Sequence, residues 1–162
     1  MNVSNDLAYI AGFLDGDGSV MLQLKPRQDY VMGFQIKATI AFYQKTNNRM
    51  VLDWLQSKLN VGRVRDRNDG ISQYDIEGYT PVKYVLELIE PFVVLKSKQV
   101  KMALALIREI EQERKTTPEQ FLERAKKIEI FQMLNYSKRS KYGYAEVKAF
   151  LNSKRFHNPR ND

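Results

Sequence analysis

The sequence predicts an α+β fold, and three observations lead to that prediction. Helical and strand-like periodicities follow one another in the order helix-strand-strand-helix-strand-strand-helix-helix along the 162 residues. A chain of this length fits one domain and can bury a core of its own. No low-complexity linker interrupts the order, so we expect residues 1–162 to form a single domain.

The first helix is expected to begin near Asp6 and to end near Asp17. One of its faces is apolar, while a second face holds only small residues. A glycine inside a helix costs about 1 kcal/mol relative to alanine, so glycines repeated on one face suggest that another helix packs closely there. The apolar face consists of Leu7, Ile10 and Leu14, and the small face of Ala8, Gly12 and Gly16.

Two acids, Asp15 and Asp17, stand where this helix should stop. The unpaired carbonyls of a helix C-terminus repel carboxylates, so a cation is expected to offset the two acids. Mg²⁺ typically uses one or two carboxylates together with water and substrate phosphate. Residues two apart on a helix do not share a face, so the remaining ligands should come from elsewhere.

Two strands with period-two alternation follow the helix, at Val20–Arg27 and Phe34–Tyr43. Pro26–Tyr30 is expected to end the first strand and start the turn. A strand of ten residues spans about 33 Å, close to one turn of B-DNA, so the hairpin could lie along a major groove. Its polar face offers amide and basic side chains: Gln23, Lys25, Arg27, Gln35 and Lys37.

A second, shorter hairpin is predicted around the turn Asn68-Asp69-Gly70. Three arginines alternate in its first strand, at positions 63, 65 and 67, and Gln73, Asp75 and Glu77 alternate in its second. One interpretation is a solvated strand face, which is common for charged residues. The other is a basic stripe that points away from the helical cover of the sheet.

The remaining segments have helical periodicity and terminal signals. Thr46 is expected to cap a helix over 47–59, and Thr117-Pro118-Glu119 to start one that ends near Leu134. Further helices are expected from Pro81 to about Ile89, from Lys98 to about Lys115, and over 145–153. The helix over 47–59 should bury Met50, Leu52, Trp54, Leu55 and Leu59.

Composition narrows the function classes. The formal net charge of +7 favours a phosphate polymer as partner, and nucleic acid over a membrane. There is no cysteine, and the only histidine, His157, lies in the tail, which excludes thiolate metal sites and histidine-based nucleases. The first residues show no export signal, so we expect an intracellular protein that is not secreted.

The segment Ile10–Gly18 resembles the signature nonapeptide of the LAGLIDADG homing endonucleases, because its small residues, both acids and closing glycine are all in place. The resemblance extends over nearly the whole chain and is to the single-motif, homodimeric branch encoded by group I introns of chloroplast and archaeal rRNA genes. It implies an αββαββα core with a curved four-stranded antiparallel β-sheet saddle and C-terminal helices. It also implies an organelle (chloroplast or mitochondrion) or the archaeal cytoplasm as the location.

The same resemblance implies the active site. Gln44-Lys45-Thr46 is similar to the family segment whose glutamine positions water, and Lys96 matches a lysine that reaches the active site. The implied catalytic residues are thus Asp17, Gln44 and Lys96, with metal held by Asp17 and Gly16. The basic pocket residue of close relatives is absent at Asn48, so either Arg49 replaces it or the solvent network differs.

A single motif per chain implies a homodimer that brings Asp17 of both protomers beside two scissile phosphates. The expected dimer contact consists of Ala8, Ala11, Gly12, Asp15 and Gly16. Matching family positions imply DNA binding by Gln23, Lys25, Arg27, Gln35, Lys37, Arg65, Arg67, Gln73 and Asp75, and backbone contacts by Ser137, Lys138, Arg139 and Lys141.

The resulting hypothesis is a site-specific homing endonuclease that cuts both strands of a long pseudo-palindromic DNA target by metal-dependent phosphodiester hydrolysis and leaves 3′ overhangs. Mg²⁺ is the expected cofactor, Mn²⁺ the expected substitute, and Ca²⁺ should support binding with little cleavage. Two alternatives on the same fold stay open. One is an RNA maturase that binds intron RNA and assists splicing, and the other is a DNA-binding regulator that does not cleave.

Overall fold

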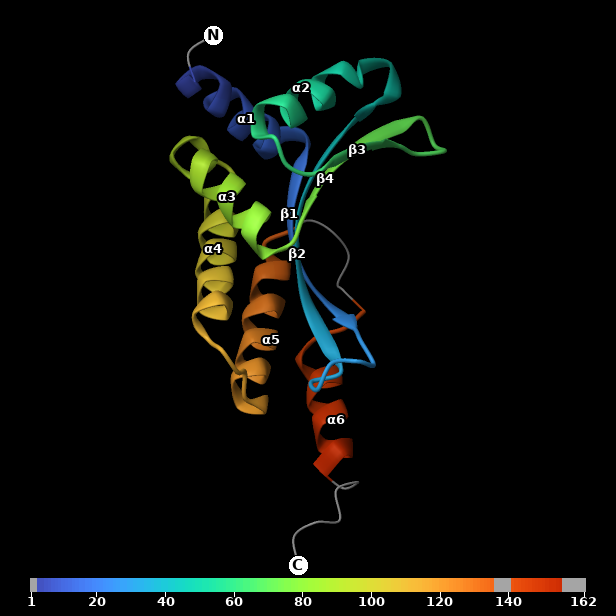
Figure 1. Ribbon diagram of the computed structural model, residues 1–162, viewed down its shortest axis with the longest axis vertical. Helices are drawn as coiled ribbons and strands as arrows, with labels where there is room; N and C mark the ends of the chain where they lie inside the picture. Colours follow the sequence, from blue (N-terminus) through green and yellow to red (C-terminus); the bar gives the residue numbers. More distant parts are fainter. Residues whose placement is uncertain (1–2, 136–140, 156–162) are drawn as a thin grey trace, which may run out of the picture. The chain divides into compact units, whose positions relative to one another are not determined.

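The computed structural model describes residues 3–135 and 141–155, and the order of its helices and strands confirms the α+β prediction (Figure 1). Two short 3₁₀ turns, η1 and η2, flank α2 and α4 on their N-terminal sides. The elements are α1 (Val3–Asp17), β1 (Gly18–Pro26), β2 (Phe34–Lys45), η1 (Thr46–Asn48), α2 (Met50–Leu59), β3 (Arg63–Asp66), β4 (Ile71–Glu77), α3 (Tyr79–Ile89), η2 (Glu90–Phe92), α4 (Ser97–Gln112), α5 (Pro118–Met133) and α6 (Tyr144–Arg155).

The four strands form one antiparallel sheet in the order β1-β2-β4-β3. β2 pairs with β4 along residues 71–77, whereas β3 pairs with residues 72–75, so that central part of β4 has a partner on either side. Tyr43 faces Gln73 and Gln73 faces Arg65, which places one residue from each of three strands in a row. The predicted turn at Asn68-Asp69-Gly70 joins β3 to β4, and Gly70 has a φ of 78°, which favours glycine.

By its contacts the chain divides into two compact units. The first unit comprises the stretch up to Met21 together with Ala38–Ile107. Its core joins α1, α2 and α3 to β2 and β4: the ring of Phe42 lies 5.9 Å from that of Phe13 and 5.7 Å from that of Tyr74. The core-facing apolar side chains are fully buried: Ile10, Leu14, Ile40, Leu52, Leu55, Ile76, Val82 and Leu86.

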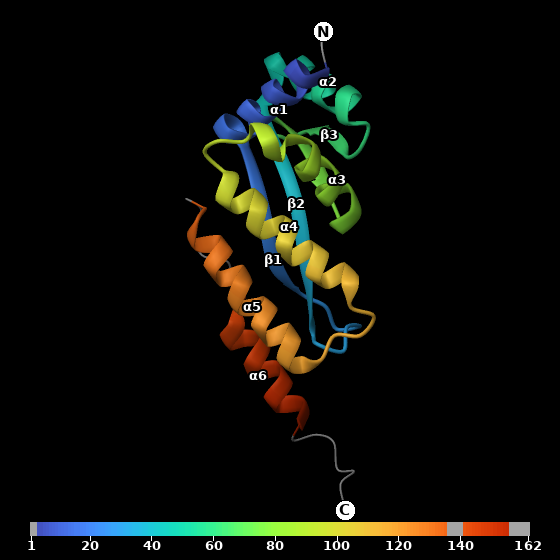
Figure 2. The same cartoon turned by 90° about the vertical axis from the view of Figure 1, so that its left-hand side faces the viewer.

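The second unit comprises Leu22–Lys37 and the stretch from Arg108 onward. In it α5 packs beside α6 (Figure 2). Phe34 at the start of β2 packs on Phe150 and Tyr142, with ring centroids 6.1 and 5.7 Å apart, and the Gln132 amide donates to the Leu22 carbonyl at 3.0 Å. The hairpin between β1 and β2 closes through the Arg27 N–H, which donates to the Gly33 carbonyl at 2.9 Å.

Several local predictions are confirmed. The alternation of β1 holds, since Val20, Leu22 and Leu24 are buried while the intervening side chains are not. Thr117 caps α5, and its hydroxyl accepts the Gln120 N–H at 3.2 Å while the Gln120 side chain accepts the Thr117 N–H at 2.8 Å.

Other predictions were wrong near helix ends. Thr46 does not cap a helix with its side chain: its hydroxyl forms a hydrogen bond with the Ser72 hydroxyl at 3.1 Å, and η1 intervenes before α2 starts at Met50. Met50, the first residue of α2, was expected to be buried but is 77% exposed. Arg67 lies beyond the end of β3, so only two of the three arginines alternate within the strand.

Among the described residues, no helix combines the length and the apolar composition that crossing a membrane requires.

Candidate functional site

The C-terminal end of α1 is tied to the segment that precedes α4. The Asp15 carboxylate accepts the backbone N–H groups of Val94, Leu95 and Lys96 at 2.8, 3.0 and 2.9 Å. Burial by itself would raise the pKa of Asp15, but these three donors and the Lys96 charge outweigh it, and the pKa lies below its ordinary value. Backbone amides, and not a metal ion, therefore offset one of the two acids at this helix end.

Lys96 is brought to the same helix end. Its Nζ donates to the backbone carbonyl of Asp15 at 2.5 Å, and its side chain is half-buried. Burial lowers the pKa of Lys96 below its ordinary value, and the negative charges of Asp15 and Asp17 offset only part of that effect. The structure thus places a partly desolvated ammonium within electrostatic reach of Asp17, although 79 residues separate the two in the sequence (96 minus 17).

Asp17 is the last residue of α1 and is exposed. Its carboxylate makes no hydrogen bond or ion pair within the part of the chain that the structure describes, which distinguishes it from Asp15. No cluster of three or more histidine, cysteine or acidic side chains suited to a metal ion occurs among residues 3–135 and 141–155. One free carboxylate beside an exposed Gly16 fits Mg²⁺, which fills its remaining positions with water and substrate phosphate.

The small-residue face of α1 is open. Ala8, Gly12 and Gly16 are exposed, and a Cβ placed on either glycine would meet no atom within 4 Å. Ala11 differs from the prediction: it is 0% exposed in the chain's own core and so has no surface to offer a second chain. Ala11 lies three residues before Leu14, on the same side of α1, and is buried with it and with Ile10.

Gln44 lies within β2, whereas it was expected to follow that strand. Asp17 and Lys96, the other two predicted catalytic residues, lie at the end of α1 instead. Oε1 of Gln44 accepts the Lys45 N–H at 2.9 Å, and no hydrogen bond joins Gln44 to Asp17 or Lys96 within the described residues. In the sheet Gln44 pairs with Ser72, and Ser72 pairs with Asp66.

Arg49 reaches the end of that row. Its guanidinium contacts Asp66 at 2.7 Å and Asp53 at 3.4 Å, while Asp66 also accepts the Ser72 hydroxyl at 2.7 Å. These bonds to Ser72 and Arg49 lower the pKa of Asp66. A positive group thus stands near Gln44 where Asn48 provides none, although two carboxylates already hold it.

Across β2, β4 and β3 the first unit presents a polar patch, which includes a hollow lined by Gly62, Arg63, Arg65, Asp75 and Glu77. Arg65 contacts Asp75 at 3.0 Å, and the Gln73 amide also donates to Asp75. Burial first, and then the charge of Asp75, raise the pKa of Tyr43. Arg67 instead pairs with Asp69 at 2.6 Å in the turn. Asp75, which was expected to face base edges, is thus engaged on both oxygens within the chain.

In the second unit, five predicted DNA-binding side chains lie on β1, β2 and the turn between them. Arg27 is held by Asp29 at 2.7 and 2.8 Å and by Gln35 at 3.2 Å, and it lies 5.0 Å from the Tyr30 ring. Gln23, Gln35 and Lys37 are half-buried and Lys25 is exposed. Lys141 is exposed, with its ammonium 5.5 Å from the Tyr142 ring, while Ser137, Lys138 and Arg139 lie outside the described residues.

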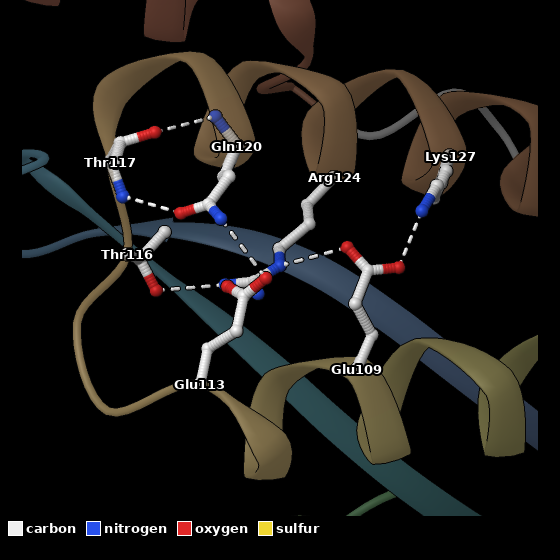
Figure 3. A network of polar contacts seen from close by, with 7 residues as sticks. All are labelled: Glu109, Glu113, Thr116, Thr117, Gln120, Arg124 and Lys127. Atoms are coloured by element: carbon white, nitrogen blue, oxygen red, sulfur yellow. Dashed lines mark hydrogen bonds and ion pairs between the residues drawn. The ribbon is translucent and has the colours of Figure 1, made fainter.

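Sequence reasoning missed one charged cluster completely. Arg124 of α5 is only 1% exposed, and it donates to Glu109 at 3.2 Å, to Thr116 at 2.8 Å and to Glu113 (Figure 3). Lys127 pairs with Glu109 as well. The signal was present as two acids four apart, Glu109 near the end of α4 and Glu113 directly after it, and as two bases three apart on one face of α5.

Known proteins resemble this chain over most of its length. The DNA endonuclease I-CreI of Chlamydomonas reinhardtii is 38% identical over 147 residues, which cover 91% of this chain and 89% of the relative. The DNA endonuclease I-CvuI of Chlorella vulgaris is 35% identical over 103 residues, 64% of each chain.

Solved structures agree with the fold. A crystal structure of I-CvuI in complex with the I-CreI target has a TM-score of 0.88 at 28% identity and covers 93% of this chain and 95% of the other. The archaeal intron-encoded I-Vdi141I in complex with DNA has a TM-score of 0.85 at 16% identity, which shows the fold alone. The sequence model of the LAGLIDADG endonucleases matches residues 10–107, more than half of the chain. These matches show that the chain belongs to the LAGLIDADG endonuclease family.

Proposed function

We propose that this chain is a site-specific homing endonuclease that hydrolyses both strands of a long pseudo-palindromic DNA target and leaves 3′ overhangs. Two similar proteins are named DNA endonucleases, and the solved structure of one of them contains a DNA target. The observation that supports the proposal most directly is the exposed Asp17 carboxylate at the end of α1, which has no hydrogen-bond partner among residues 3–135 and 141–155, with Lys96 held beside that end.

In the proposed reaction Asp17 and the Gly16 carbonyl would hold Mg²⁺. When bound, the ion would stabilise negative charge on the phosphate and make water a better nucleophile. Lys96, fixed through the Asp15 carbonyl, stabilises charge on the phosphate and the leaving oxygen. Gln44 orients the attacking water, and Arg49 supplies the positive charge that Asn48 lacks.

The assembly in this proposal is a homodimer. Two α1 helices would pack through their open faces at Ala8, Gly12 and Gly16, because small side chains let helices approach closely. The twofold axis would bring two Asp17 side chains together, so that each strand is cut once. Two carboxylates that lie close together repel each other unless cations neutralise them, which agrees with a metal-dependent reaction.

DNA binding in this proposal uses the polar strand side chains described above. Arg65, Arg67 and Gln73 in the first unit, and Gln23, Lys25, Arg27, Gln35 and Lys37 in the second, are the proposed readers of base edges. Lys141, together with Ser137, Lys138 and Arg139, is the proposed contact to the DNA backbone. The surplus of positive charge supports such binding, because each neutralised phosphate releases counterions.

The test compares the unmodified protein with Asp17→Asn on a duplex selected from a randomised library, in gel-shift and nicking assays with Mg²⁺ and with Ca²⁺. Asn keeps the size of the side chain and removes its charge, so cleavage should fall by at least 100-fold, while binding persists or tightens. Glu87→Gln, which removes an exposed carboxylate on α3, is the matched control and should cut normally.

Two outcomes would contradict the proposal in different ways. Undiminished cleavage by Asp17→Asn would place the metal elsewhere. An unmodified protein that binds its selected duplex with Mg²⁺ but never cuts it would favour the non-cleaving regulator, and preferential binding of intron RNA would favour the maturase.

A further inference from the structure

Asp75 occupies an unusual position within the polar patch of the first unit. Its side chain is 11% exposed, whereas that of its partner Arg65 is 59% exposed. Oδ2 of Asp75 contacts the Arg65 Nη2 at 3.0 Å, and Oδ1 accepts the Gln73 amide N–H at 2.5 Å. Both oxygens therefore have partners within the chain, and one of these partners, Arg65, is far more exposed than Asp75 itself.

The strand register explains this arrangement. Arg65 and Gln73 face each other across β3 and β4, while Asp75 follows Gln73 on the same face of β4, two residues further along. Side chains two apart on a strand point to the same side of the sheet. Asp75 thus contacts Gln73 along β4 and Arg65 diagonally across on β3, and it links these two side chains to each other.

The carboxylate makes the position of Arg65 hard to change. A nearly buried charge costs free energy unless it is paired. A rotation of Arg65 toward a DNA phosphate would remove the ion pair and leave Asp75, of its two partners described above, the neutral Gln73 amide. Interfaces gain specificity when the competing arrangement leaves such a group unpaired. The ion pair therefore fixes the orientation of Arg65, and the N–H donors that do not contact Asp75 stay available to DNA in that orientation. Because the side chain is already ordered, DNA binding costs less conformational entropy.

Building on the proposed function, we propose that Asp75 is a positioning residue for sequence readout: it does not contact DNA, and it holds Arg65 and Gln73 as one coupled reading unit. The base recognised by an oriented arginine is guanine, whose O6 and N7 accept two N–H donors in the major groove. Gln73 reads the same or the adjacent base pair. Asp75 in this way sets specificity, not overall affinity.

The structure also contains a control pair. Arg67 and Asp69 lie 2.6 Å apart in the turn, but their side chains are 46% and 49% exposed. Water can replace Asp69 as a partner of Arg67, because an exposed ion pair contributes little. The change Asp69→Asn therefore removes the same charge from the same kind of pair without stranding a buried group.

The experiment selects duplexes from a randomised library with Ca²⁺ present, using the unmodified protein, Asp75→Asn, Arg65→Ala, the double variant and Asp69→Asn. A preference of roughly tenfold or more for guanine at one base pair is expected for the unmodified protein, as one bidentate contact provides. Asp75→Asn should reduce it to about twofold at the same base pair that Arg65→Ala affects. The double variant should be no worse than Arg65→Ala alone, and Asp69→Asn should keep the preference.

Other outcomes would overturn the inference. If Asp75→Asn keeps the guanine preference, changes a different base pair, or adds to Arg65→Ala in the double variant, Asp75 does not position Arg65. If the unmodified protein shows no sequence preference at all, the proposed function fails, and this inference fails with it. A preference that survives in Asp75→Asn refutes the inference alone.

A second measurement needs no variant and covers the case in which Asp75→Asn does not fold. In a crystal structure of the unmodified protein with its selected duplex and Ca²⁺, the Asp75 carboxylate should still contact Arg65 and Gln73, with Arg65 donating to a guanine. A hydrogen bond from a cytosine or adenine amino group to Asp75 itself would overturn the positioning role.

Discussion

Asp15 provides the sharpest test of how the end of α1 is held. Its carboxylate accepts three backbone N–H groups from residues 94–96, and its own carbonyl accepts Lys96 Nζ. In Asp15→Asn an amide NH₂ replaces one of the two oxygens and faces N–H groups that cannot accept a hydrogen bond. At least one of the three bonds is then lost, and those that remain involve a neutral acceptor.

The expected loss of stability follows from the strength of such bonds. Hydrogen bonds to a charged group contribute about 1.5–3 kcal/mol each, but bonds that share one acceptor do not add up. Because the side chain is only half-buried, water replaces part of the lost interaction. We expect Asp15→Asn to lower the free energy of unfolding by about 2–3 kcal/mol at neutral pH.

Urea unfolding followed by circular dichroism measures this difference, and its pH dependence identifies the cause. The pKa of Asp15 is lower in the folded chain than its ordinary value of 3.8, so its contribution is present above that value and is lost as the pH falls through the lowered pKa. The gap between the two proteins should therefore narrow below about pH 4. Asp53→Asn, at a 50% exposed ion pair, should cost less than about 1 kcal/mol. A loss below about 0.5 kcal/mol for Asp15→Asn, or a gap that does not change with pH, would refute the reasoning.

Two further predictions concern other parts of the chain. Arg124→Met removes a buried guanidinium that pairs with Glu109 and Glu113, and should lower the free energy of unfolding by about 3 kcal/mol; unchanged urea stability would contradict this. Gly12→Leu should leave circular dichroism unchanged, because a Cβ there meets no atom within 4 Å, and should convert a dimer into a monomer in analytical ultracentrifugation. A stable monomer in the unmodified protein would disprove the proposed dimer.

Local features of this protein could be predicted from sequence alone, because they depend on residues close together in the chain. The alternation of β1, the end of α1 at Asp17 and the capping box at Thr117 all follow from spacing within a few residues. The turn at Asp69-Gly70 follows for the same reason, since glycine readily takes the positive φ found there. The motif at Ile10–Gly18 indicated the family through the same short-range pattern.

Tertiary structure decided which polar groups became partners. Asp15 and Asp17 look equivalent in the sequence, yet Asp15 meets three backbone amides about 80 residues away, while the Asp17 carboxylate has no hydrogen-bond partner among the described residues. Arg124 resembles any charged residue of an amphipathic helix until the end of α4 and the residue after it bring Glu109 and Glu113 opposite it. Asp75 resembles a base-reading side chain until the β3–β4 register places Arg65 and Gln73 over it. Such pairings depend on the packing of distant segments, and periodicity along the chain does not specify which faces meet or in which register.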